Sequence, residues 1–118
     1  MVSNSIDVDR EEVLTQLREP GPDSDRLIGM LLGRDVKAWT TNFDLAESLV
    51  PIEAIYTLSH NDDRTYYWCD VSNGLHHVQG WGRTPACALA AAGVAYIIDT
   101  RRVEGRERLA ESNLSQLH

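Results

Sequence analysis

Cysteine is scarce in this chain of 118 residues, which contains only Cys69 and Cys87. The two lack the CxxC spacing of metal and redox sites, so the sequence predicts free thiols in a reducing cytoplasm. Long apolar runs are also absent, because the longest near-continuous one, residues 86–98, is too short and too rich in alanine to span a membrane. No basic segment followed by an apolar core marks the chain for export. We therefore expect a cytoplasmic protein that does not bind a membrane.

Basic residues are outnumbered, with 11 Lys and Arg against 18 Asp and Glu and a net charge of −7. Nucleic-acid phosphates repel such a chain unless a local basic groove overrides its field, and the sequence contains no such groove. We expect no direct contact with nucleic acid. The acidity fits a basic protein partner or simple solubility, and most of it comes from residues 1–25.

What the sequence does contain is an ordinary globular composition, 42% hydrophobic and 25% charged, at a length that suits one compact domain. The segment Pro20-Gly21-Pro22 ends a first amphipathic helix. We therefore expect an acidic helical leader over residues 1–22, separable from a core domain over residues 23–100. Residues 101–118 are expected to form a polar tail or short helix.

Two further helices are expected before any strand. The first has Ser24 or Asp25 as its N-cap and Gly33 just past its C-terminus. The second is short and begins after Thr41 or Asn42. Both patterns place leucines on one side, so both helices are expected to face a core.

From residue 54 the pattern changes to β-branched and aromatic residues. Residues 54–59 and 65–71 read as strands, and Asn73-Gly74 between the second and a third strand is a strong signal for a two-residue hairpin. A helix after the third strand, capped by Thr84 with Pro85 in its first turn, closes the domain. The sequence thus predicts an α+β fold in the order α-α-β-β-β-α, with a three-stranded antiparallel meander.

A two-residue loop at Asn73-Gly74 would pair Asp70 with His77 and Tyr66 with Trp81. Strand alternation then separates two faces of the sheet. The face expected to join the core carries Tyr67, Cys69, Val71, Val78 and Gly80. The other face is either a binding surface or half covered by another helix, and it carries Tyr66, Trp68, Asp70, His77, Gln79 and Trp81.

Gly80 and Gly82, followed by Arg83, raise the question of a phosphate-binding loop at a helix N-terminus. The pattern lacks the third glycine of a dinucleotide site and the Gly-Lys-Ser/Thr of a P-loop, and Pro85 removes one donor. The alternative is structural: Gly80 relieves crowding between strand and helix, and Gly82 turns the chain.

Three stretches, residues 30–33, 40–44 and 84–92, stand where matching motifs occur in a family of small tailed-phage proteins. Over residues 24–100 the chain resembles this family, the phage alpha-beta-alpha sandwich domain. It departs from the pattern at Arg34-Asp35, where many relatives carry a tryptophan. The resemblance implies a phage or prophage gene acting in the bacterial cytoplasm, and it brings no catalytic residues.

The leading hypothesis is a non-enzymatic phage accessory protein that inhibits a host protein or ribonucleoprotein complex, such as a CRISPR effector. No cofactor or metal is expected, and a homodimer is left open. Partner binding is assigned to aromatic and polar side chains of the second strand face, to the loop after it and to one acidic hairpin: Tyr66, Trp68, Asp70, His77, Trp81, Arg83, Asp62 and Asp63.

Two alternatives remain. One is a sponge for a nucleotide signal, with Trp81 and Arg83 at the ligand. The other is a small hydrolase using Asp70 and His77, although Ser72, the nearest hydroxyl, is expected to point to the opposite face. Cys69 and His76 are also assigned to that opposite face, so a metal site drawing on both pairs is excluded.

Overall fold

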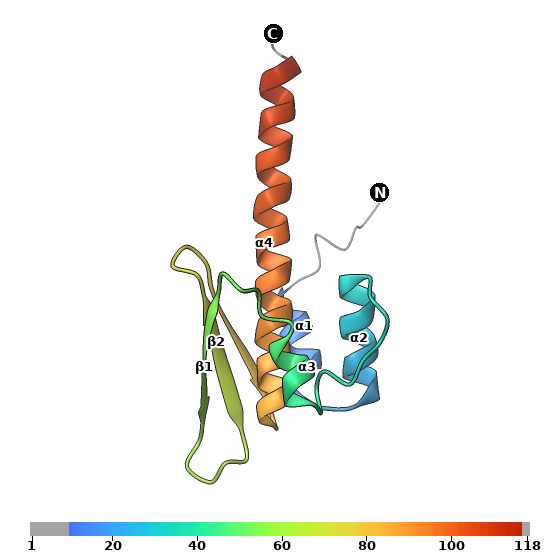
Figure 1. Ribbon diagram of the computed structural model, residues 1–118, viewed down its shortest axis with the longest axis vertical. Coiled ribbons are helices and arrows are strands. Elements are labelled where there is room, and N and C mark those ends of the chain that lie inside the picture. The colour runs from blue at the N-terminus through green and yellow to red at the C-terminus, as the bar shows by residue number, and fades with distance from the viewer. Residues whose placement is uncertain (1–9, 117–118) are drawn as a thin grey trace.

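Three helices precede a three-stranded sheet, and a fourth, much longer helix follows it (Figure 1). The computed structural model describes residues 10–116, with side chains described over residues 12–101. The elements are α1 (Arg10–Gln16), α2 (Pro22–Leu32), α3 (Phe43–Glu47), β1 (Ile55–His60), β2 (Tyr67–Ser72), β3 (His77–Gly82) and α4 (Pro85–Gln116). The predicted α+β fold with an antiparallel meander is confirmed.

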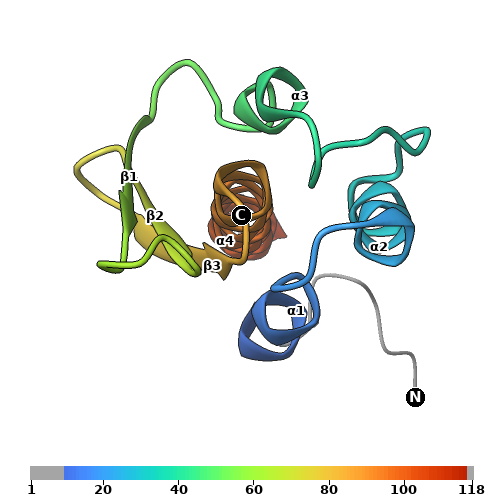
Figure 2. The same ribbon diagram turned by 90° about the horizontal axis from the view of Figure 1, so that it is seen from below.

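The sheet has the order β1-β2-β3, and within residues 10–116 it carries helices on one face only. Viewed along α4, all four helices lie on the same side of the sheet, and α4 is the one that lies against it (Figure 2). We call the side away from α4 the outer face. None of the helices within residues 10–116 is long and apolar enough to cross a membrane.

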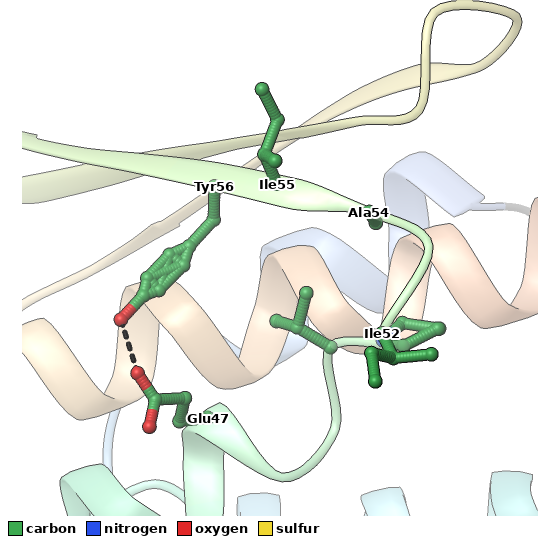
Figure 3. A pocket seen from close by; sticks show the side chains of 7 residues that line it. Glu47, Ile52, Ala54, Ile55 and Tyr56 are labelled. Carbon is green, nitrogen blue, oxygen red and sulfur yellow. Dashed lines mark hydrogen bonds between the residues drawn. The ribbon is translucent and has the colours of Figure 1, made fainter.

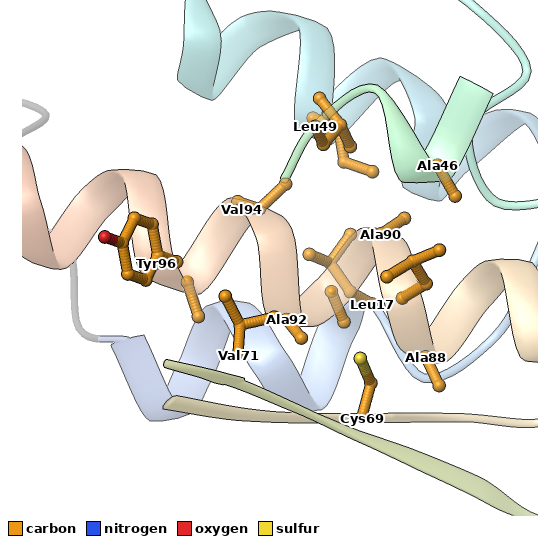
Figure 4. Packing of buried hydrophobic residues seen from close by; sticks show 14 of the residues in the cluster. Leu17, Ala46, Leu49, Cys69, Val71, Ala88, Ala90, Ala92, Val94 and Tyr96 are labelled. Atoms are coloured by element: carbon orange, nitrogen blue, oxygen red, sulfur yellow. The ribbon is translucent and has the colours of Figure 1, made fainter. Parts of the chain in front are cut away.

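The N-terminal half of α4 is the centre of the core (Figure 4). It is buried on every side, because β2 and β3 lie along one side, α3 with Leu49 lies on another, and α1 packs beside it. Small side chains allow this close enclosure of a helix that is apolar all round. Its fully buried residues include Cys87, Ala88, Leu89, Ala90, Ala91, Ala92, Val94 and Ala95.

The two glycines of β3 are explained by this contact. A Cβ atom added at Gly80 would lie 2.3 Å from the backbone nitrogen of Ala92, and one at Gly82 would lie 2.7 Å from that of Ala88. Thr84 caps α4 as predicted, since its hydroxyl accepts a hydrogen bond of 3.1 Å from the N–H of Cys87. Close packing and capping therefore account for this junction without a ligand.

Helix α1 belongs to the core and is not a separable arm, which corrects the division at residue 22. Val13, Leu14 and Leu17 are buried in the same cluster as α4, and the Cys87 thiol donates a hydrogen bond of 2.8 Å to the Leu17 carbonyl. Residues 1–9 of the expected leader lie outside the described residues. At the other end, the expected tail continues α4 as far as Gln116.

Helix α2 begins at Pro22 after Gly21, so neither Ser24 nor Asp25 is its N-cap. Asp25 is instead buried, and its carboxylate accepts two hydrogen bonds of 2.9 Å from the N–H and hydroxyl of Thr40. This contact ties the start of α2 to the segment before α3. At their other predicted boundaries the helices agree with the sequence: Gly33 is left-handed (φ 64°) after α2, and Asn42 caps α3.

The register of β2 and β3 differs from the predicted one by two residues. Asp70 faces Gln79 and Ser72 faces His77, so the connection has four residues rather than two. The two-residue turn requires positive φ at both Asn73 and Gly74, and only Gly74 has it (φ 90°). The Asn73 side chain instead donates a hydrogen bond of 2.7 Å to the Tyr96 hydroxyl on α4. Because a shift of two residues preserves the alternation, both predicted faces are correct.

Candidate partner-binding face

The outer face of the sheet brings the predicted binding residues into rows. Trp68 lies opposite Trp81 in one row, with Ser59 of β1 beside Trp68. The next two rows are polar apart from Ile55 and consist of Thr57, Asp70 and Gln79, then Ile55, Ser72 and His77. The face is thus aromatic toward the end of β3 and hydrophilic toward the β2–β3 turn.

The aromatic cluster consists of Tyr66, Trp68 and Trp81. The ring centroids of Trp68 and Trp81 are 5.8 Å apart, and those of Tyr66 and Trp81 are 5.7 Å apart. These are ordinary distances for packed aromatic pairs. All three side chains are half-buried, and within residues 10–116 no helix lies on this face (Figure 2). The alternative that another helix half covers this face is not met within residues 10–116, because α1 and α2 lie on the α4 side of the sheet.

Asp70 is the hydrogen-bond acceptor of the polar rows. Its Oδ1 accepts a hydrogen bond of 3.0 Å from Gln79 and lies 3.0 Å from Nε2 of His77. His77 is therefore a diagonal neighbour of Asp70 rather than its direct partner. The His77 side chain is 62% exposed and that of Asp70 is 31% exposed. The predicted pair exists, held on an open surface.

Ser72 corrects the sequence analysis, because it lies on the same face as Asp70 and directly opposite His77. Its hydroxyl oxygen accepts a hydrogen bond of 3.2 Å from the Gly74 N–H. No described hydrogen bond joins Ser72 to His77, which is the contact that activates a serine nucleophile. Among the described residues, no three His, Cys, Asp or Glu side chains lie close enough together to hold a metal ion.

The acidic hairpin between β1 and β2 adjoins Tyr66. Within it, the Asp63 carboxylate accepts a hydrogen bond of 2.7 Å from the Thr65 hydroxyl, and this bond lowers the pKa of Asp63. Asn61 accepts the N–H groups of Thr65 and Tyr66, so the hairpin is held by its own side chains. Asp62 and Asp63 are exposed, which places two negative charges beside the aromatic end of the sheet.

Arg83 follows the end of β3 but is already paired. Its Nε donates to the Glu19 carboxylate at 2.5 Å, and its backbone N–H donates to the Arg18 carbonyl at 3.2 Å. The guanidinium is therefore held by the segment after α1, and the space above the neighbouring Gly80 and Gly82 is occupied by α4. The geometry does not favour an anion site at this loop.

The buried thiols take no part in this face. Burial raises the pKa of both Cys69 and Cys87 to about 12, so both thiols stay protonated and unreactive at neutral pH. Cys69 faces the core from β2, as expected from alternation.

Sequence reasoning missed a cleft of about 370 Å³ between α3 and β1 (Figure 3). At one end the Tyr56 hydroxyl donates a hydrogen bond of 2.5 Å to the Glu47 carboxylate, and this bond, aided by burial, raises the pKa of Tyr56 to about 12. The remaining lining is apolar and comes from Val50, Pro51, Ile52, Ala54 and Ile55. No sequence signal predicts it, because it depends on how α3 sits against the sheet.

Comparison of the chain with protein families, with curated proteins and with solved structures returned no match.

Proposed function

We propose that this chain is a non-enzymatic inhibitor that binds a protein or ribonucleoprotein complex of a bacterial host, in the manner of a phage anti-defence protein. It acts in the host cytoplasm, on a target such as a CRISPR effector. The observation that carries the proposal is the uncovered aromatic cluster of Tyr66, Trp68 and Trp81.

An open aromatic cluster is the kind of surface that partners bind. Energetic hot spots at protein interfaces are enriched in tryptophan and tyrosine, and a partner would bury the part of these half-buried rings that still faces solvent. The polar side chains beside the cluster, Asp70, Gln79 and His77, supply the hydrogen-bonding rim that such interfaces have.

Charge supports a basic target. The chain has a net charge of −7, and Asp62 and Asp63 stand beside the aromatic cluster. A basic surface, such as the groove with which a nucleic-acid-binding complex holds its substrate, would be attracted to this end of the sheet. Binding there excludes the nucleic acid, which is the mechanism of inhibition that we propose.

The test is to express the chain in bacteria that carry an active CRISPR system and to measure the plating of a targeted phage. Wild type is expected to restore plating, and the double variant Trp68→Ala/Trp81→Ala to lose that effect. For the purified target, the dissociation constant of the complex should rise by about 30-fold or more in this double variant, since loss of even one hot-spot residue costs about 2 kcal/mol. Met30→Ala is the matched control, because Met30 is a large apolar side chain, 71% exposed, on α2.

Two outcomes would redirect the proposal. A rise in melting temperature with a cyclic dinucleotide or ADP-ribose, abolished by Arg83→Ala, would favour nucleotide capture. Loss of activity in His77→Ala with binding retained would favour a hydrolase. Absence of any specific partner for wild type at low salt, together with unchanged phage plating, would refute inhibition altogether.

A further inference from the structure

Within residues 10–116, strand β1 pairs with β2 on one side only, so the other edge of β1 is free. Paired antiparallel residues alternate between hydrogen-bonded and non-bonded positions. The bond of 3.1 Å from the Asn61 N–H to the Tyr66 carbonyl sets the phase, so Ile55, Thr57 and Ser59 bond to β2. The N–H and C=O groups of the residues between them therefore point away from the sheet. We call this row, formed by Tyr56, Leu58 and His60, the open edge.

The open edge has none of the usual protection against strand addition. Natural edge strands carry proline, lysine or inward-pointing charges, or are bent by bulges. Strand β1 has the sequence Ile-Tyr-Thr-Leu-Ser-His and pairs with β2 over all six residues without a bulge. At the opposite edge, one outward group, the Arg83 N–H just after β3, is bonded to the Arg18 carbonyl.

The cleft between α3 and β1 lies beneath the open edge (Figure 3). Tyr56 and Leu58 face the same side of the sheet as the buried Val71 and Cys69, yet they are only half-buried. Ile55, on the outer face of the same strand, is 75% exposed. A strand added to the open edge would cover apolar groups on both faces, with alternate side chains directed over the cleft.

The charges that flank β1 indicate which kind of strand would bind there. The strand itself has no acidic or basic residue apart from His60, but Glu53 precedes it and Asp62 and Asp63 follow it. A second copy, paired antiparallel about Leu58, would bring Glu53 of each chain toward Asp63 of the other. Like charges placed opposite one another destabilise a sheet. A segment with a cation at each end would be attracted at both.

We propose that the open edge of β1 is a strand-addition site for an extended segment of the partner protein, with alternating apolar residues and a Lys or Arg at each end. The inference rests on the proposed function for its partner, whereas the site itself is tested without that partner. Main-chain hydrogen bonds to Tyr56, Leu58 and His60 supply affinity, and the cleft and flanking carboxylates supply specificity.

The probe is a synthetic seven-residue peptide of alternating valine and threonine with lysine at both ends, titrated into the isotope-labelled chain. Amide hydrogen exchange at Tyr56, Leu58 and His60 should slow by about tenfold or more at saturation, while that at Thr57 and Ser59, already bonded to β2, stays unchanged. The same peptide N-methylated along its bonding edge should bind at least about tenfold more weakly. A version with glutamate at both ends should also bind more weakly, by an amount that falls as salt rises.

Leu58→Pro is the matching protein variant, because it removes an outward N–H without removing a bond to β2. In Leu58→Pro the peptide should no longer slow amide exchange at the open edge, whereas in Leu58→Ala it still should. Circular dichroism checks that both variants stay folded. Unchanged exchange at the open edge of wild type, or equal binding of the N-methylated peptide, would overturn the inference. Protection of the same amides without peptide, in a chain that sediments as a dimer, would assign the edge to a second copy.

Failure here is distinguishable from failure of the proposed function. Phage inhibition that depends on Trp68 and Trp81 but not on Leu58→Pro would remove only the strand-addition site. Peptide binding by a chain that inhibits no host complex would leave the site and remove the function.

Discussion

The two edges of the sheet contrast sharply in how the helices cover them. At β3, Gly80 touches the backbone of α4 and Val78 is 2% exposed. At β1, Tyr56 and Leu58 point toward the same helical layer but remain half-buried, and Ile55 on the other side is 75% exposed. Packing is complete at one edge and incomplete at the other.

The difference follows from the width of a single helix. A helix with its side chains is about 10 Å across, and neighbouring strands are about 4.8 Å apart, so one helix covers about two strands. Helix α4 lies against β3 and β2 and scarcely reaches β1. Packing against the long helix is thus concentrated at β2 and β3, and within the described residues the edge of β1 is left uncovered.

The contact at Gly80 should give the largest effect on stability. Gly80→Ala forces a methyl group to within 2.3 Å of the Ala92 nitrogen, and because the three nearest atoms all belong to the backbone of α4 we expect a loss of about 3 kcal/mol or more. Gly74→Ala is the control, since no atom lies within 4 Å and only the positive φ of 90° opposes it, at about 1 kcal/mol. Urea unfolding measures both. Equal losses would mean that α4 can move away from β3.

A pair of truncations compares the covered and uncovered strands directly. Val71→Ala, at a fully buried position on β2, should lower the free energy of unfolding by about 2 kcal/mol. Leu58→Ala removes a larger side chain from β1 but should lower it by only about 1 kcal/mol, because that side chain is half-buried. If urea unfolding shows that Leu58→Ala lowers the free energy of unfolding more than Val71→Ala does, then β1 is packed as tightly as β2 and the contrast between the two edges is wrong.

High pH should also destabilise the folded chain. Cys69 and Cys87 have their pKa raised from 9.0 to about 12 in the folded chain. Below pH 9 both states keep their protons, so stability is complete; above pH 9 the unfolded chain ionises first, and stability falls progressively toward pH 12. Tyr56, raised from 10.0 to about 12 mainly by its bond to Glu47, adds the same loss from pH 10 upward.

Urea unfolding at pH 8, 9 and 10 checks the thiol contribution. Extending the series to pH 11 checks Tyr56, because a Tyr56→Phe variant should differ from wild type in its slope only above pH 10. A free energy of unfolding that rises between pH 8 and pH 10 would contradict the assignment. Exposed Asp63, whose pKa is lowered, acts only at the acid end and does not affect this range.

Local sequence patterns correctly predicted the two faces of the sheet, although the predicted register of β2 and β3 was wrong by two residues. The Asn73-Gly74 signal located the β2–β3 turn but not its length, because Asn73 bonds to Tyr96 on α4 instead of adopting positive φ. Alternation survived the two-residue shift, so the pairing of Trp68 with Trp81 on the outer face required only a correction of register. The prediction that Ser72 faces away from Asp70 was wrong because residues 70 and 72 are two apart in one strand and must share a face.

Local sequence was enough to predict the presence of the helices and strands, the caps at Asn42 and Thr84, the left-handed Gly33 and the two faces of the sheet. These depend on neighbours within a few residues, through periodicity and hydrogen bonds to the adjacent backbone. Three features follow from packing between distant segments. Helix α1 packs into the core, Asp25 bonds to Thr40, and within the described residues the outer face and the β1 edge are left uncovered. Those outcomes depend on where one long helix lies across the sheet, and packing between distant segments leaves no local pattern from which that position can be derived.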